Sequence, residues 1–300
     1  MNLKRWTAWT TGLFCSLVST LALADVLPER GGDNYKDGGS RWFPSYPRDV
    51  SLYGERIDWL INITAVFCII LFVIMCIWMV WACLAHNQNH EAEYDHGNSK
   101  HSVVMALGIS AAIFFVVDGN LFYHSVKDLN EAFWDWEEAN SGIKIEINAH
   151  QWAWDARYPG PDGKFCVKGD ETCDDIVTLN DIRIPMDTPV YFQVASTDVI
   201  HSFYLPNFRA KQDATPGMVN HMWIQASSEK FKEQGLTTPQ EFEIACAQHC
   251  GSHHYKMRGT LTVLSKEDYE AWAGHASQLN SRAYDKEDLD SHWGWSWESI

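Results

Sequence analysis

The sequence has little positive charge: its 300 residues carry 23 Lys and Arg against 39 Asp and Glu, a formal net charge of −16. Proteins that bind nucleic acid use basic side chains against phosphates, so this balance argues against nucleic acid and favours a basic protein partner. The sequence also lacks a Cys-x-x-Cys-His motif. A covalently attached c-type heme is therefore excluded.

Charge is also missing from two long apolar stretches. Residues 59–85 contain no Asp, Glu, Lys or Arg, and residues 102–123 contain only Asp118. Each stretch is long enough to cross a bilayer as a helix, and the polar loop 86–101 joins them, which predicts a transmembrane hairpin. An acid inside a span marks either a functional site or a wetted helix end, and Asp118 allows both interpretations.

The first 24 residues have the pattern of a signal peptide. Lys4 and Arg5 precede an apolar run from Leu13, which ends in Ala22-Leu23-Ala24. An uncleaved third transmembrane helix is the alternative, but the apolar run is short for one. Export of residue 25 followed by two crossings places residues after 124 outside. We expect a multi-pass protein of the bacterial inner (plasma) membrane with its large domain in the periplasm.

Beyond the hairpin the periodicity changes to two, as in Ile143-Lys-Ile145-Glu-Ile147. Such alternation is typical of half-buried strands, and several short runs of this kind predict an all-β sandwich or barrel. The expected strands are 143–147, 176–178, 182–184, 190–194, 199–205, 218–225, 241–246 and 259–264, with a helix at 266–280. The expected domains are a signal peptide 1–24, a periplasmic lead-in 25–56, a two-helix hairpin 57–126, a linker 127–142, a periplasmic β domain 143–265 and an acidic C-terminal helix and tail 266–300.

The strongest chemical signal is Cys246-x3-Cys250-x3-His254-x2-Met257. Thiolate, imidazole and thioether together favour copper. A single blue copper needs one Cys, so the second thiolate indicates two metals bridged by both sulfurs, with a further His supplied from elsewhere, such as His201. A zinc knuckle or a Cys246–Cys250 disulfide is the alternative.

Four motifs carry a resemblance to a known family. They are DVIHSF at 198–203, CAQHCGSHHYKM at 246–257, HQWAW at 150–154 and KQDATPG at 211–217. Together, and in their order along the chain, they resemble cytochrome c oxidase subunit II, which holds the dinuclear copper centre CuA. The resemblance implies a cupredoxin-like Greek-key domain that accepts electrons from cytochrome c. It also implies transfer of those electrons to heme in subunit I for reduction of oxygen to water.

The resemblance also implies roles for particular residues. Cys246 and Cys250 bridge the coppers, His201 and His254 bind one copper each, Met257 is a weak axial ligand, and the Gln248 carbonyl is the other. His249 and His253 stay outside this set. Trp152 is implied as the point where electrons arrive, and Asp198 and Asp155 as acids that dock a basic cytochrome c. Implied partners are subunit I, other oxidase subunits, cytochrome c and membrane lipid.

The sequence departs from the family at two places. Gln248 stands where the family usually has Glu, whose side chain reaches a magnesium ion at the interface with subunit I. Gln carries no charge, which puts this magnesium in doubt, although Asp213 keeps its Lys-Gln-Asp context. The second span lacks the family's Glu-x-x-Trp-Thr-x-x-Pro, so a part in proton uptake is not implied.

Cys166 and Cys173 form a separate pair, seven residues apart. In an exported domain two close thiols are expected to oxidise, which predicts a disulfide, with an extra metal site as the alternative.

Three rival functions share parts of these patterns. A nitrous oxide reductase also has a CuA domain but needs a long histidine-rich propeller, and a quinol oxidase subunit lacks the Cys pair. A membrane-tethered copper carrier or oxidase assembly protein remains the alternative function, but it would expose a single open copper site.

Overall fold

The computed structural model describes residues 47–283, apart from 89, 92, 93, 95, 168 and 169. The predicted signal peptide, most of the lead-in and the end of the acidic tail lie outside the described residues. The described residues from Val50 onward belong to one compact unit.

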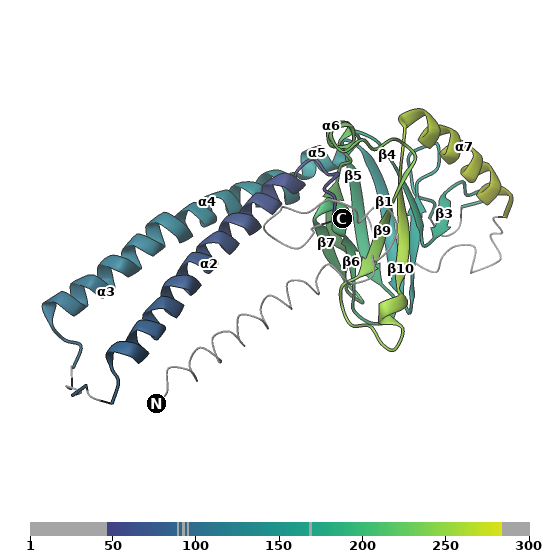
Figure 1. Cartoon of the computed structure of the whole chain (residues 1–300). Helices are drawn as coiled ribbons and strands as arrows, with labels where there is room; N and C mark the ends of the chain where they lie inside the picture. Colours follow the sequence, from purple (N-terminus) through teal and green to yellow (C-terminus); the bar gives the residue numbers. More distant parts are fainter. Residues whose placement is uncertain (1–46, 89, 92–93, 95, 168–169, 284–300) are drawn as a thin grey trace, which may run out of the picture. The chain divides into compact units, whose positions relative to one another are not determined.

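Two helical segments precede the β domain (Figure 1). The first is α2, Gly54–Ala85, and the second comprises α3 (Lys100–Ile113), η3 (Phe114–Asp118), α4 (Gly119–Asp128), η4 (Leu129–Phe133) and α5 (Trp136–Asn140). Side chains of Ser51 and Ser99 accept hydrogen bonds from the first turns of α2 and α3. Both segments are long and apolar enough to span a membrane. Asp118 ends the π-helical turn η3, with its side chain exposed.

The rest of the described chain forms two five-stranded sheets. One has the order β3-β2-β1-β5-β8 and the other β4-β10-β9-β6-β7. The strands of the first are β1 (Ile143–His150), β2 (Ala153–Tyr158), β3 (Ile176–Leu179), β5 (Val190–Ser196) and β8 (Asn220–Ile224). Those of the second are β4 (Asp181–Pro185), β6 (His201–Leu205), β7 (Ala210–Ala214), β9 (Gln240–Cys246) and β10 (Arg258–Leu264).

The core lies between the two sheets, because alternate residues of each strand point inward. Ile145 and Phe192 from the first sheet and Phe203, Ile244 and Leu261 from the second are fully buried in one cluster. The predicted architecture, a helical hairpin followed by an all-β domain, is confirmed.

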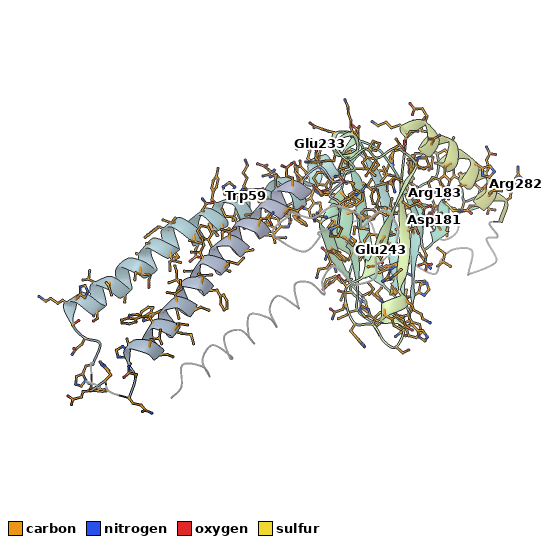
Figure 2. The ribbon with its side chains drawn as sticks, in the orientation of Figure 1. Trp59, Asp181, Arg183, Glu233, Glu243 and Arg282 are labelled. Carbon is orange, nitrogen blue, oxygen red and sulfur yellow. A yellow bond between two sulfur atoms is a disulfide. The ribbon has the colours of Figure 1, made fainter. Side chains whose placement is uncertain are left out.

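Two strands and one helix were not expected from the sequence. β2 and β7 fall outside the predicted ranges, as does the short helix α6, Ser228–Glu233. The C-terminal helix α7, Lys266–Ala283, lies where the sequence predicts one. It packs beside β4, which carries Arg183 (Figure 2). The guanidinium of Arg183 lies over the ring of Trp272 of α7, 5.3 Å from the ring centroid.

Candidate metal centre

The sulfur and imidazole donors come together through pairing of two strands distant in the sequence. His201 is the first residue of β6, and Cys246 is the last residue of β9. These strands are antiparallel neighbours, with Phe203 opposite Cys246. The loop from β9 to β10 then returns to the same end of the sheet, because the Cys246 amide donates to the Met257 carbonyl at 3.2 Å.

The six donors implied by the resemblance lie around one point. The sulfur atoms of Cys246 and Cys250 are 3.8 Å apart, and their Sγ atoms and a ring nitrogen of His201 lie within 4.8 Å of one another. His254 Nδ1 is 3.6 Å from Cys250 Sγ.

The two weaker donors flank this group. Met257 Sδ is 3.7 Å from Cys250 Sγ and 3.1 Å from His201 Nδ1, and the Gln248 carbonyl accepts from Cys246 Sγ at 3.1 Å. Two neighbouring sulfurs with imidazole, thioether and carbonyl donors beside them are a donor set that fits copper.

The two thiols differ in acidity. Burial acts to raise the pKa of Cys246, but hydrogen bonds with His201 and with the backbone at Ser202 and Gln248 outweigh it and lower the pKa. Burial, together with the neighbouring Cys246, raises the pKa of Cys250. One thiolate therefore forms readily, and the second needs a cation to stabilise it.

Asp198 fixes the orientation of the His201 ring. Its Oδ1 atom lies 2.8 Å from Nε2 of His201, which directs Nδ1 toward the sulfur atoms. Its Oδ2 atom accepts from the backbone amide of Gln151 at 2.6 Å. A carboxylate behind a ligating histidine sets the tautomer of the ring and raises its basicity.

Trp152 contacts the metal loop directly. Gln151 and Trp152 form the turn between β1 and β2, and the side chains of both donate to the Cys250 carbonyl, at 2.8 and 3.2 Å. Trp152 is half-buried, whereas Trp154 on β2 is fully buried in the core. The two tryptophans therefore differ in environment because only Trp154 lies on a strand.

Gly251 allows this contact. Its φ is +118°, and a Cβ atom there would come within 2.9 Å of Gln151 Nε2 and 3.3 Å of the Trp152 ring. Gln151 and Gly251 were missed as positioning residues by sequence reasoning. The only sequence signal for them was their position next to Trp152 and Cys250. The contact between these two segments forms only in the folded chain, so the sequence does not predict it.

The two remaining histidines of the loop lie beside the donor group, and the His249 ring packs against that of His254, with ring centroids 5.6 Å apart. His249 and His253 are exposed. The His253 ring packs against Trp152, with ring centroids 4.5 Å apart. The choice of His254 over His253 as a metal ligand stays a prediction, which the position of His254 Nδ1 near Cys250 Sγ supports.

The two predicted docking acids already have partners. Asp198 is engaged with His201, and Asp155 on β2 lies 3.2 Å from His150 Nε2, with its pKa raised by burial. Asp213 is exposed on β7, where it accepts from Ser202 at 2.7 Å. The docking and magnesium assignments stay predictions.

Cys166 and Cys173 are joined by a disulfide, which leaves no free thiolate there for a metal. The Arg157 side chain donates to the Cys166 carbonyl and to Asp175, which tethers this loop to β2.

Comparisons with known proteins find similar sequences for most of the chain. Residues 143–263 match the family model of the cytochrome c oxidase subunit II periplasmic domain. The alternative cytochrome c oxidase subunit 2 of Bradyrhizobium diazoefficiens is 28% identical over 222 residues, covering 68% of this chain and 72% of the relative. Cytochrome c oxidase subunit 2 of Cereibacter sphaeroides is 24% identical over 90% of this chain and 91% of the relative.

Among solved structures, the periplasmic domain of subunit II of cytochrome oxidase from Bradyrhizobium japonicum is 27% identical. The match covers 46% of this chain and 94% of that domain, with a TM-score of 0.36.

Proposed function

The chain belongs to the cytochrome c oxidase subunit II family through residues 143–263, and on this premise we propose that it is the electron-accepting subunit of a bacterial cytochrome c oxidase. It takes electrons from cytochrome c at a dinuclear copper centre. It passes them to heme in subunit I, where oxygen is reduced to water. The chain contributes to an oxidoreductase complex. The reduction of oxygen takes place in subunit I of that complex, and not in this chain.

One observation carries this proposal: two thiol sulfurs 3.8 Å apart, enclosed by imidazole, thioether and carbonyl donors. Copper ions held by Cys246, Cys250, His201 and His254 would supply a one-electron carrier. All six donors would come from the chain itself, which favours electron transfer over the binding of a substrate. Such a site relays electrons and makes or breaks no bond of a substrate.

The chain's own residues hold the donors and lead electrons to them. Asp198 orients His201, and the pairing of β6 with β9 sets its distance from Cys246. Trp152 is half-exposed and bonded to the carbonyl of a bridging cysteine, so it offers a short bonded path from the surface to the sulfur. His201 and Met257 are buried, which excludes water from that side.

The two apolar helices and the matched family fit a membrane protein with its β domain in the periplasm. We propose the bacterial inner membrane, contact with subunit I and membrane lipid, and Trp152 with Asp198 and Asp155 as the contact surface for cytochrome c. A magnesium ion near Asp213 belongs to the same proposal, but Gln248 would bring it no charge.

The proposal is tested by loading the detergent-solubilised chain with copper and recording its optical and EPR spectra. A purple, mixed-valence signal from one electron shared by two coppers is expected. It should be lost in Cys246→Ser and in His254→Ala. The matched control, His253→Ala, should keep it, because His253 faces Trp152.

A blue or colourless product with a single copper would contradict the electron-relay function. It would favour instead a copper carrier or assembly protein, and the ligand assignment would have to be withdrawn.

A further inference from the structure

The turn between β6 and β7 binds the first membrane helix through a two-point contact. Arg209 donates from Nε to Asp58 Oδ1 at 2.7 Å and from Nη2 to Asp58 Oδ2 at 2.8 Å. Its Nη1 donates to the Pro206 carbonyl at 2.7 Å, within the same turn. Guanidinium and carboxylate paired at two points have a defined relative orientation, which a single contact does not impose.

This contact is shielded and is built at an energetic cost. The Arg209 side chain is 8% exposed and that of Asp58 is 21% exposed. Arg209 has φ of +55°, a backbone conformation that an ordinary turn would give to Gly. A non-glycine residue held there indicates that its side chain has a role to which the turn is adapted.

The other end of the same hairpin carries a copper donor. In the β6–β7 pairing, His201 lies opposite Ala214, and Leu205 lies opposite Ala210 next to the turn. At about 3.3 Å per residue, the length of β6 separates His201 from Leu205 by about 13 Å. One short hairpin therefore joins the metal centre to helix α2.

Further contacts at the same level make the junction stiff. In the same turn, the Asn207 carbonyl accepts a hydrogen bond from the Val50 amide at 3.0 Å. Lys230 of α6 lies 2.5 Å from Glu55 of α2. Arg56 of α2 pairs with Asp128 and Glu131 of the second helical segment, so both legs of the hairpin are tied to one another.

We propose that the Arg209–Asp58 pair is a positioning device for electron transfer: it fixes the height and orientation of the metal centre over the membrane, so that the distance to the acceptor in the partner subunit stays constant. This inference rests on the proposed function. Electron transfer between fixed centres slows steeply with distance, so a loose junction would slow the transfer out of the centre. Neither residue touches a metal donor, and electron uptake at Trp152 should not depend on them.

The test uses the assembled, membrane-extracted oxidase with the full chain. We would compare Arg209→Met, Asp58→Asn, the double variant and Arg209→Lys. The matched control is Arg258→Met, which breaks a pair between an exposed arginine and the partly buried Glu243 on the neighbouring strand. Copper content and spectrum, KM for cytochrome c and the rate of electron transfer from copper to heme are measured for each.

We expect normal copper spectra and an unchanged KM in every variant, with a several-fold slower copper-to-heme rate in Arg209→Met and Asp58→Asn. The double variant should be no slower than either single variant, because both remove the same contact. Arg209→Lys should recover part of the rate, and Arg258→Met should have the wild-type rate.

A wild-type rate in Arg209→Met with full copper would overturn the proposal. So would a slower rate that only matches a loss of copper, since Arg209 would then be needed for folding alone. If the Arg209→Met protein does not accumulate, Asp58→Asn replaces it in the test, because this variant keeps the size of the side chain. Its copper content and copper-to-heme rate are then judged in the same way. Absence of the dinuclear spectrum from the unmodified protein would instead refute the proposed function.

Discussion

Asp198 accepts hydrogen bonds from two residues near the metal centre, His201 at the start of β6 and Gln151 in the turn between β1 and β2. It therefore couples the imidazole donor to the turn that carries Trp152. Its carboxylate also accepts from the Val199 amide at 2.6 Å, and these bonds outweigh burial and lower its pKa. The residue stays charged at neutral pH, as a partner of a metal-bound imidazole should.

Replacing Asp198 should weaken copper binding without unfolding the domain. In Asp198→Ala the His201 ring loses the acceptor that orients it, and we expect copper affinity to fall by about 10- to 100-fold. Competition with a copper chelator measures this affinity. Asp162→Ala removes an exposed carboxylate from a distant loop and should bind copper as the unmodified chain does. Equal affinities in both variants would contradict a role for Asp198.

Gly251→Ala should destabilise the domain and disturb Trp152. The positive φ alone should cost about 1–3 kcal/mol, and the new methyl group would also meet Gln151 and Trp152. Denaturant unfolding measures the free energy, and Trp152 fluorescence reports the displaced ring.

Gly163→Ala separates the effect of the positive φ from the effect of the contact with Gln151 and Trp152. Gly163 also has a positive φ, +72°, but open space around its Cβ position. It should lose stability while Trp152 fluorescence and electron uptake stay normal. Identical effects of the two variants would argue against a specific contact.

At the scale of elements, a buried ionic cluster joins β1, β2 and the loop before β3. Arg157 of β2 pairs with Glu146 of β1 at 3.2 Å and with Asp175 at 2.6 Å, and all three are almost fully buried. Burial raises the pKa of Glu146 to about 7, despite the attraction of Arg157. Two carboxylates share one guanidinium, so one of them is readily neutralised.

This cluster predicts a pH dependence of stability. Folded Glu146 keeps its proton up to about pH 7, whereas in the unfolded chain it loses it near its ordinary value of 4.5. Stability should therefore fall as pH rises through this interval, by at most about 3 kcal/mol, since one pKa unit corresponds to about 1.4 kcal/mol. Urea unfolding between pH 4.5 and 8 measures the slope.

Glu146→Gln provides the control for that slope. It keeps a hydrogen-bond acceptor for Arg157 but cannot ionise, so the decrease of stability between these pH values should flatten. An unchanged slope would place its origin outside this cluster.

At the scale of the whole molecule, two apolar helices precede the β domain and determine whether the protein is stable in a membrane or in water. Helix α2 exposes a nearly continuous apolar surface, including Ile70 and Phe72 near its middle. Such a surface is stable in lipid and unfavourable in water.

Ile70→Lys should impair membrane insertion. A lysine at the centre of a span costs about 2.5–3.5 kcal/mol on insertion scales. Carbonate extraction of membranes should release more of this variant than of Ile70→Leu, which preserves the apolar surface. Equal retention of both variants would argue that α2 does not lie across the bilayer.

Some features of this protein follow from the sequence by itself, because they depend on residues close together in the chain. The apolar lengths of the two spans, the period-two runs and the spacing Cys246-x3-Cys250-x3-His254-x2-Met257 are local patterns. Burial of one face of a strand or one length of helix acts directly on such patterns. These local patterns are therefore sufficient to predict the fold class and most of the strands.

The tertiary structure decided the features that depend on long-range contacts. β7 has polar residues at its centre and was missed, because it is held by pairing with β6 at the sheet edge. The Cys250 carbonyl shared by Gln151 and Trp152 and the Arg209–Asp58 pair both join residues distant in sequence. Their cause is hydrogen bonding between segments that only the folded chain brings together, and no local periodicity records it.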